Sequence, residues 1–303
     1  MVDAWFMSGL SNIDKPSSIR GVKGNEIVLK NFAYSLSSGF GKYEVDFNSF
    51  SFDNKRGEIY RASNTIILKK SNIAIFPIIY TFTLNSSLKI KVSNVSEEHT
   101  LQIDNDNTRI KISKDGIYTI PVPSNGYLGF GTKTILDSCN ITITQLPSAY
   151  EDALVFDGVD DYGICNNLPI LTDYTVICRR VIENDTNVVA SKSIVAGNGA
   201  FIFEYANNAT YSFSEYTSGL NMNLKDSVSY QTKNSYNGSV ITVGTANDTD
   251  TLTLGIIREK DSRLLKGAIY YFALYNKSLT PEEIEEEKVK LENYWEGGKN
   301  ELA

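Results

Sequence analysis

The feature that most constrains this chain is a hydrophobic alternation of period two. In "SSLKIKVSNV", Leu88, Ile90 and Val92 alternate with lysines, and "CNITITQLP" alternates isoleucines with threonines until Pro147. A period of two places the apolar side chains on one face of a strand. Because short segments of this kind are separated by polar turns, we predict a small antiparallel β-sandwich over residues 44–147.

Strand-like segments resume after a short polar connector. They include "YTVICRRVI" (174–182), "AFIFEYA" (200–206) and "GAIYYFALYN" (267–276). The last segment is almost entirely apolar or aromatic, which is typical of a strand buried on both faces. We therefore predict a second all-β unit over residues 148–303.

One helix is predicted near the C-terminal end, over residues 280–296. Thr280 is suited to the N-cap and Pro281 to the first helical position, and Glu283 completes a capping box. An apolar stripe at helical spacing follows. We expect this stripe to pack against the second unit.

Composition and charge exclude several classes of function. The 303 residues carry a formal charge of −7 and lack a long basic cluster, so we expect no nucleic-acid partner. No apolar run approaches the roughly 20 residues of a membrane span, so we expect no membrane partner. The first residues lack the basic start and apolar run of a secretion signal. The three cysteines lack metal spacing, and we expect no cofactor.

The stretch "DALVFDGVDDYGI" (152–164) concentrates aspartates in an apolar run. Asp157, Asp160 and Asp161 follow or flank a glycine, which suits a tight turn whose carboxylates bond the local backbone. Carboxylates are also calcium ligands, but the regular spacing of a dedicated calcium loop is missing. The turn interpretation is favoured, and we predict no metal site.

The sequence gives little support for catalysis. Retaining glycoside hydrolysis needs two carboxylates about 5 Å apart, yet Glu204 and Glu215 are eleven residues apart in sequence and are predicted to face outward from strands. The one histidine, His99, lies in a polar turn. We therefore predict a protein that is not an enzyme, with no catalytic residues, and a glycoside hydrolase is disfavoured.

A polar stretch over residues 215–238 contains Tyr216, Tyr230 and Tyr236. Aromatic faces together with amides and hydroxyls suit sugar binding, by stacking and hydrogen bonding. These three tyrosines are the predicted glycan-binding residues. The alternative is a solvated loop whose tyrosines cover neighbouring apolar surface.

Two segments carry a resemblance to a known family. "ALVFDGVDDYGI" resembles the first strand and turn of laminin-G-like, concanavalin-A-like jelly rolls, and residues 252–284 resemble their closing segment. The layout of residues 3–43, a small sandwich and then "GVDDYGICNNLPIL" is similar to virion-associated proteins of crAss-like and other Bacteroidota phages. The resemblance implies a jelly roll over 148–303, an inserted sandwich over 44–147, and residues 1–43 as an arm or edge strands of the jelly roll.

The function implied by this resemblance is that of a non-enzymatic phage structural protein in the virion: a head fibre, tail fibre or capsid decoration. Its partners would be other virion proteins, with adhesion to host-surface or mucosal glycans as a further role. The alternative is a carbohydrate-binding accessory module of a bacterial surface glycan-utilisation system. Trp5, Phe6, Met7 and Leu10 would be costly to expose, so we expect a homo-oligomer, with a trimer favoured. A monomer whose arm completes its own sheet is the alternative.

Overall fold

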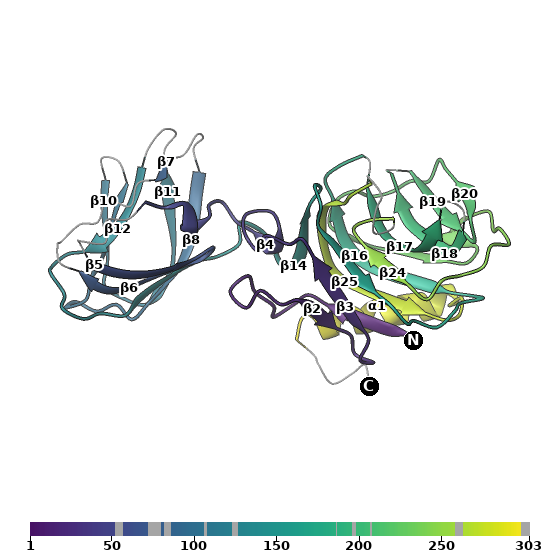
Figure 1. Cartoon of the computed structure of the whole chain (residues 1–303), viewed down its shortest axis with the longest axis horizontal. Coiled ribbons are helices and arrows are strands. Elements are labelled where there is room, and N and C mark those ends of the chain that lie inside the picture. Colours follow the sequence, from purple (N-terminus) through teal and green to yellow (C-terminus); the bar gives the residue numbers. More distant parts are fainter. Residues whose placement is uncertain are drawn as a thin grey trace. The chain divides into compact units, whose positions relative to one another are not determined.

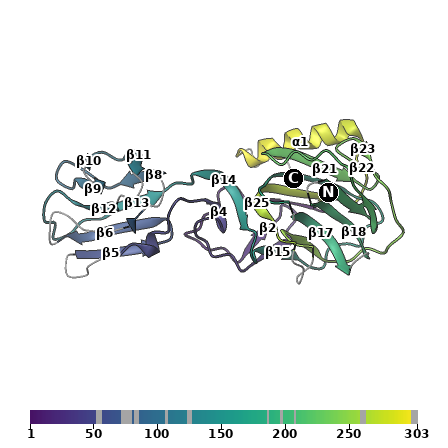
Figure 2. The same ribbon diagram turned by 90° about the horizontal axis from the view of Figure 1, so that it is seen from above.

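The chain folds into two compact units, shown in Figures 1 and 2. The larger unit comprises Met1–Ala33, Ser37–Phe40 and Asp152–Ala303, and the inserted unit comprises Tyr34–Leu36 and Gly41–Glu151. The predicted small sandwich, 44–147, falls within the inserted unit. The computed structural model describes residues 1–51, 57–71, 80–81, 86–105, 108–122, 127–185, 187–195, 198–206, 208–257 and 263–297.

The larger unit contains two eight-stranded sheets, and the strand pairings described in it are antiparallel. We call them the helix-side sheet and the opposite sheet. The helix-side sheet has the order β23–β22–β21–β16–β25–β14–β4, and β1 also pairs with β25. Its strands are β1 (Asp3–Phe6), β4 (Gly39–Lys42), β14 (Ala149–Asp157), β16 (Thr175–Ile182), β21 (Ser227–Thr232), β22 (Ser235–Tyr236), β23 (Ser239–Val240) and β25 (Lys266–Tyr275).

The opposite sheet has the order β2–β3–β15–β24–β17–β18–β19–β20. Its strands are β2 (Ser18–Arg20), β3 (Glu26–Lys30), β15 (Tyr162–Cys165), β17 (Val188–Val195), β18 (Asn198–Tyr205), β19 (Ala209–Ser212), β20 (Glu215–Thr217) and β24 (Leu252–Leu254). Phe156 and Phe272 of the helix-side sheet and Phe201 and Phe203 of the opposite sheet are all buried. Together with their neighbours they form the apolar core of the larger unit.

The first 42 residues supply strands to both sheets of the larger unit. Strand β1 pairs with β25, with Trp5 opposite Phe272, while β3 pairs with β15. Trp5 and Met7 are fully buried within their own chain. These side chains therefore need no partner subunit to cover them, which favours the alternative in which the arm completes its own sheet: β1 lies beside the long apolar strand β25.

A buried carboxylate fixes the N-terminal segment. Asp3 accepts hydrogen bonds from the backbone nitrogens of Ala4 (2.8 Å), Lys23 (2.7 Å) and Asn25 (2.9 Å), and from the side-chain amide of Asn25 (2.8 Å). A Cβ on Gly21 would lie 2.4 Å from this carboxylate, so glycine is required there. Since four donors satisfy the buried acid, it ties β1 to the turn between β2 and β3.

The single α-helix among the described residues, α1 (Pro281–Trp295), lies along the outer face of the helix-side sheet (Figure 2). The predicted capping box is confirmed: the Thr280 side chain accepts from the Glu283 nitrogen, and the Glu283 carboxylate accepts from the Thr280 nitrogen. The Tyr271 hydroxyl of β25 donates to Glu292 at 2.8 Å. Among the described residues no helix is both long and apolar enough to cross a membrane.

The inserted unit packs a five-stranded sheet, order β11–β8–β13–β6–β5, against a four-stranded sheet, order β10–β9–β12–β7. The predicted alternation is confirmed, because Leu88, Ile90 and Val92 are all buried. Its elements are η1 (Phe47–Ser49), β5 (Gly57–Ala62), β6 (Thr65–Ser71), β7 (Tyr80–Thr81), β8 (Ser86–Ser93), β9 (Leu101–Asn105), β10 (Thr108–Ile112), β11 (Gly116–Val122), β12 (Tyr127–Thr132) and β13 (Ile141–Gln145).

The two ends of the inserted unit lie next to each other. The Ser148 nitrogen donates to the Lys42 carbonyl oxygen at 2.7 Å. Gly41 has φ +78, and a Cβ there would lie 2.7 Å from the Pro147 ring, so only glycine fits without strain. An insert whose ends are adjacent leaves the strands on either side free to pair as they would without it.

Candidate functional site

The three tyrosines predicted to bind glycans occupy three different environments. Tyr236 on β22 is 1% exposed, whereas Tyr216 on β20 is 46% exposed. Tyr230 on β21 is partly buried, and the Lys288 Nζ of α1 lies 4.8 Å from its ring centroid. The grouping of these residues into one sugar site is wrong. Tyr216 lies on the opposite sheet, whereas Tyr230 and Tyr236 lie on the helix-side sheet, Tyr230 beside α1 and Tyr236 in the core.

Glu204 is fully buried, so the prediction that it faces outward is also wrong. A β-bulge explains the difference. The register between β18 and β19 shifts between Ile202 and Tyr205, and Glu204 has φ +55. The Phe203 ring packs 6.2 Å from that of Tyr236, so Phe203 and Glu204 both point into the core. An extra residue in a strand re-aims the side chains that follow it, which simple alternation does not anticipate.

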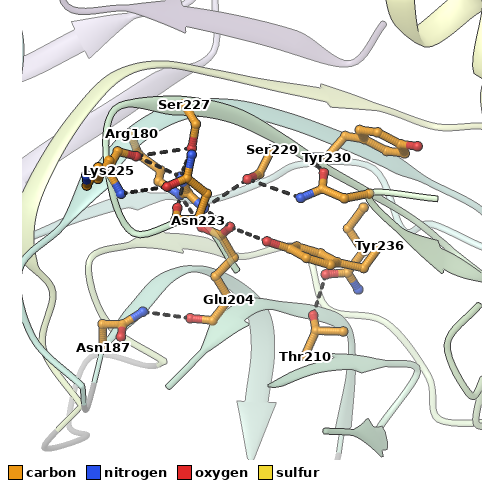
Figure 3. Close-up of polar contacts among 12 residues, drawn as sticks. Arg180, Asn187, Glu204, Thr210, Asn223, Lys225, Ser227, Ser229, Tyr230 and Tyr236 are labelled. Carbon is orange, nitrogen blue, oxygen red and sulfur yellow. Dashed lines mark hydrogen bonds and ion pairs between the residues drawn. The ribbon is translucent and has the colours of Figure 1, made fainter. Parts of the chain in front are cut away.

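Glu204 lies at the centre of a buried polar network (Figure 3). The Arg180 guanidinium makes two bonds to its carboxylate, one of 2.6 Å from Nε to Oε2 and one from Nη2 to Oε1. The Tyr236 hydroxyl donates to Oε1 at 2.7 Å. Arg180 also donates to the hydroxyls of Ser227 (2.6 Å) and Ser229 (2.9 Å). Both buried charges are thus paired and hydrogen-bonded, as burial of charge requires.

The protonation states of this network follow from its geometry. Burial alone would lower the pKa of Arg180, but the Glu204 carboxylate outweighs burial and raises it overall. Burial, followed by the charge of Glu204, raises the pKa of Tyr236 well above its usual value. Arg180 and Tyr236 therefore both keep their protons at neutral pH and act as donors to the same carboxylate.

The network continues through Gln231 on β21. Its amide nitrogen donates to the Tyr174 hydroxyl (2.7 Å) and to the Tyr211 carbonyl oxygen (2.9 Å), and its amide oxygen accepts from the Thr210 hydroxyl. The Tyr174 hydroxyl in turn donates to Ser212 at 3.0 Å. Because these residues come from both sheets, the polar layer joins the helix-side sheet to the opposite sheet across the interior.

A second buried ion pair joins Lys192 on β17 to Asp248, with 2.5 Å between Nζ and Oδ2. The Lys192 ammonium also donates to the carbonyl oxygens of Pro169 (3.1 Å) and Thr249, and Asp248 accepts from the Ala200 nitrogen (3.1 Å). Burial lowers the pKa of Lys192, and the neighbouring Asp248 opposes that shift. This pair ties the extended segment before β24 to β17 and β18.

Neither ion pair is placed to act on a substrate. The side chains of Arg180, Glu204, Lys192 and Asp248 are all 0% exposed. A general acid or base must come within hydrogen-bonding reach of the group it protonates or deprotonates. These charged groups instead bond within their own unit: the Arg180–Glu204 pair joins the two sheets, and the Lys192–Asp248 pair joins an extended segment to the opposite sheet.

The acidic turn brings Asp157, Asp160 and Asp161 together, with carboxylate oxygens within 4.8 Å of one another. Asp157 accepts from the Val159 nitrogen at 2.7 Å, and Asp161 accepts from the Asp157 nitrogen (3.1 Å) and the Ser38 hydroxyl (3.0 Å). Burial raises the pKa of Asp161 to about 7. The bonds from the Val159 and Asp157 nitrogens are those expected of a turn, while the bond from Ser38 ties the turn to the N-terminal segment. If a cation bound there, these three carboxylates would be its ligands.

The cysteines and the histidine offer no activated nucleophile among the described residues. All three cysteines are free, and Cys165 and Cys178 are buried. Burial raises the pKa of Cys165 to about 11 and that of Cys178 well above its usual value. Since the thiolate is the reactive form, these thiols are inert at neutral pH. The His99 backbone nitrogen donates a hydrogen bond to the Ser96 hydroxyl within a turn, and the sequence predicts a turn there.

Three tyrosines gather on the outer face of the opposite sheet, on the neighbouring strands β18, β19 and β20. The ring centroids of Tyr205 and Tyr211 are 5.2 Å apart, those of Tyr211 and Tyr216 are 5.0 Å apart, and those of Tyr205 and Tyr216 are 6.2 Å apart. The Arg263 guanidinium lies 4.3 Å from the Tyr205 centroid. We call these four residues the tyrosine face.

Sequence reasoning found only Tyr216 of the tyrosine face. Alternation in "ATYS" would assign the Tyr211 ring to the core, whereas the structure turns Thr210 and Ser212 inward and Tyr211 outward. Tyr205 could not be found either, because the bulge at Glu204 reverses the expected direction.

The inserted unit has an open depression of about 650 Å³. Its lining is mixed, with Lys89, Glu44 and Glu151 beside small residues and Tyr150. The Tyr150 ring is already contacted by the Lys42 ammonium, 5.6 Å from its centroid. With a single ring and charges of both signs, this depression offers less for sugar stacking than the tyrosine face.

The comparisons with protein-family models, with curated proteins and with solved structures give no match for this chain.

Proposed function

We propose that this chain is a non-enzymatic structural protein of a phage particle, a head fibre, tail fibre or capsid decoration. In this proposal the larger unit is a concanavalin-A-like, laminin-G-like jelly roll displayed on the virion. It serves assembly with other virion proteins and adhesion to host-surface or mucosal glycans. The sequence resemblance to virion-associated proteins of crAss-like and other Bacteroidota phages is the origin of the proposal.

The observation that carries the proposal is the layout of the larger unit. Residues 1–40 supply strands to both sheets that residues 152–303 complete, and the insert has adjacent ends. This layout supports the arrangement of arm, insert and jelly roll that the resemblance implies. Two eight-stranded antiparallel sheets with a helix on one outer face support the jelly-roll assignment.

The non-enzyme part of the proposal is supported by where the acids lie. Glu204 is enclosed with Arg180, and Asp248 with Lys192, while Glu215 is exposed at the start of β20. A glycoside hydrolase would need two accessible carboxylates facing one another. Purified protein incubated with a polysaccharide panel should therefore release no reducing sugar.

A second candidate function is that of a carbohydrate-binding accessory module of a bacterial surface system. The tyrosine face favours it, because a cluster of one exposed and two partly buried rings with hydroxyls suits sugar binding on any displayed domain. The two candidates differ in where the protein is found, not in what the tyrosine face does.

The deciding experiment is to locate the chain. Antibodies raised against the purified protein are applied to gradient-purified phage particles and to the envelope fraction of uninfected host cells, with gold labelling and quantitative mass spectrometry. The proposal predicts a fixed copy number per particle and regularly spaced label. Detection only in envelopes of uninfected cells would contradict it and favour the accessory module.

The homotrimer stays a prediction, and the burial of Trp5 and Met7 removes the argument from an exposed arm. Light scattering of the full chain at micromolar concentration checks it. A trimeric mass would support display on a fibre, whereas a monomeric mass would contradict the trimer in solution.

A further inference from the structure

We propose that the tyrosine face, formed by Tyr205, Tyr211, Tyr216 and Arg263, binds a pyranose sugar that carries a carboxylate. This inference deepens the glycan-adhesion part of the proposed function and rests on it. It assigns a place and a ligand class: an acidic sugar, either a uronate or a sialate, whose C–H face stacks on tyrosine and whose carboxylate meets the guanidinium.

The rings are fixed in place from below. Val188, Ile202 and Ile257 form a buried apolar cluster, and Tyr205 and Tyr211 pack against it. Tyr216 extends the group to the edge strand β20 and is 46% exposed. One side of the group is therefore held by the sheet while the other faces solvent, so little side-chain entropy remains to be lost when a ligand stacks.

The backbone also holds one pair of rings together. Tyr211 and Tyr216 are directly opposite in the β19–β20 register. The two-residue turn between these strands, Phe213–Ser214, has positive φ at both positions (+45 and +73), as the hairpin turn that matches strand twist requires. Phe213 is buried against the Tyr174 ring at 5.9 Å, which anchors this turn. The pair is thus preorganised by the hairpin.

The phenol groups are available as hydrogen-bonding partners. Among the described residues, none of the hydroxyls of Tyr205, Tyr211 and Tyr216 has a hydrogen-bond partner. Burial, and then the neighbouring tyrosines, raise the pKa of Tyr211, so its hydroxyl is neutral and can donate. This contrasts with Tyr174, Tyr236 and Tyr271, whose hydroxyls all bond within the chain.

Arg263 supplies the charge that selects an acidic sugar. Arg109, Arg179 and Arg180 each pair with a carboxylate of the chain. Arg263 has no carboxylate partner among the described residues, and its guanidinium is stacked on Tyr205. A stacked guanidinium keeps its donors free at the ring edge, where they match the two oxygens of a carboxylate. This is the reason to expect an acidic sugar in preference to a neutral one.

The test is calorimetric titration of the full chain with defined oligosaccharides: a uronate oligomer, a sialylated trisaccharide, and neutral oligomers of matched length. The variants are Tyr216→Ala, Tyr211→Phe, Arg263→Gln and Arg263→Lys. The matched control is Tyr60→Ala, which removes a 52% exposed tyrosine from β5 of the inserted unit. Tryptophan fluorescence verifies that the variants in the larger unit are folded, and far-ultraviolet circular dichroism verifies that Tyr60→Ala is folded.

One acidic probe should bind more tightly than its neutral counterpart. We expect Tyr216→Ala and Arg263→Gln each to weaken that binding by about tenfold or more. Arg263→Lys should weaken it nearly as much because the stacked fork is lost. Tyr211→Phe should weaken it by a smaller factor, and Tyr60→Ala should leave it unchanged. Which acidic probe binds identifies the sugar as a uronate or a sialate.

Two outcomes would overturn the inference. The first is that no probe binds the folded chain at millimolar concentration. The second is that binding occurs but is unchanged by Tyr216→Ala and Arg263→Gln, or is equally tight for neutral sugars. Failure of the proposed function is a separate result, because it is read from the presence of the chain on particles. A particle-bound chain that binds none of the probes overturns only this inference.

Discussion

The two units of this protein bury different chemistry. The inserted unit buries an apolar cluster and neutral polar side chains such as Gln102 and Gln145, but no charged side chain among the described residues. The larger unit contains every buried charged side chain among the described residues: Asp3, Asp161, Arg180, Lys192 and Glu204. Both units are antiparallel β structures of similar element length, so the secondary structure does not explain the difference.

The two cores are therefore specified in different ways. An apolar core tolerates changes that keep volume and pattern, because dispersion and water exclusion are not directional. The Arg180–Glu204 pair stabilises one arrangement only, since each charge is satisfied by particular partners and removal of one leaves the other uncompensated. We therefore expect the larger unit to be the more sensitive to polar substitutions and the inserted unit to cavities.

The largest effect is expected from Glu204→Leu. It leaves the Arg180 guanidinium buried without its carboxylate, which costs about 3–5 kcal/mol of unfolding free energy. Both tryptophans, Trp5 and Trp295, belong to the larger unit, so their fluorescence in a urea titration reports this unit alone.

The matched control replaces the whole group. A triple variant removes both charges and the phenol hydroxyl: Arg180→Met, Glu204→Leu and Tyr236→Phe. Its free energy of unfolding should regain most of what Glu204→Leu alone loses. If Glu204→Leu alone lowers the free energy of unfolding by less than about 1 kcal/mol, the claim that the buried pair specifies the structure of the larger unit is contradicted.

A similar loss is expected from Phe130→Ala, but in the other unit. Phe130 is fully buried and packs near the rings of Phe47 (5.9 Å) and Phe50 (6.1 Å), so truncation leaves a cavity costing about 3–5 kcal/mol. Far-ultraviolet circular dichroism should show an early transition, while the tryptophan transition stays in place. A shift of both transitions together would show that the units unfold as one.

A smaller effect, a dependence of stability on pH, is expected at the acidic turn. Burial raises the pKa of Asp161 to about 7, so the folded state binds a proton more tightly than the unfolded state between about pH 4 and pH 7. Stability contributed by this group is then present at low pH and is lost as pH rises through 7. The expected fall is about 2 kcal/mol between pH 5 and pH 7.

Asp161→Asn mimics the protonated acid and should flatten this dependence, whereas Asp160→Asn, at an exposed position, should not. Urea midpoints followed by tryptophan fluorescence from pH 5 to pH 8 check it. The same titration at pH 8 with millimolar calcium tests the alternative use of the turn. Stabilisation by calcium that Asp161→Asn abolishes would establish a metal site and contradict the turn interpretation.

The smallest effect is expected at the turn between β19 and β20, the hairpin that pairs Tyr211 with Tyr216. Ser214 has φ +73, and its hydroxyl is buried without a partner among the described residues. Ser214→Gly removes both the backbone strain at positive φ and the unpartnered hydroxyl, so it should stabilise the larger unit by about 0.5–1 kcal/mol. Ser214→Ala removes only the hydroxyl, so a smaller gain for alanine assigns the remainder to backbone strain. Destabilisation by glycine would be the contrary result.

The contrast between the units also explains what the sequence could predict. The core of the inserted unit follows from alternation alone, because each strand presents its apolar residues to one face: Leu88, Ile90 and Val92 needed no tertiary information. The helix was equally readable, since the capping box at Thr280 and Glu283 is local in sequence.

The polar interior of the larger unit was not readable for a physical reason. Glu204 and Arg180 are 24 residues apart, and they meet only because the bulge turns Glu204 inward. The same bulge returns Tyr205 to the outer face beside Tyr211 and Tyr216. One irregular residue thus decided both the buried acid and the candidate sugar site, and alternation gives no signal for it.

The central claim is that residues 1–33, 37–40 and 152–303 form a self-contained unit that folds without the insert. Lys42 and Ser148 are already hydrogen-bonded, so residues 43–147 can be replaced by a two-residue Asn-Gly turn joining them. The measurement is a urea titration of this shortened chain, followed by tryptophan fluorescence. We predict that the shortened chain unfolds in one cooperative transition, with a urea midpoint close to that of the larger unit in the full chain. Aggregation, or the absence of a cooperative transition, would contradict it.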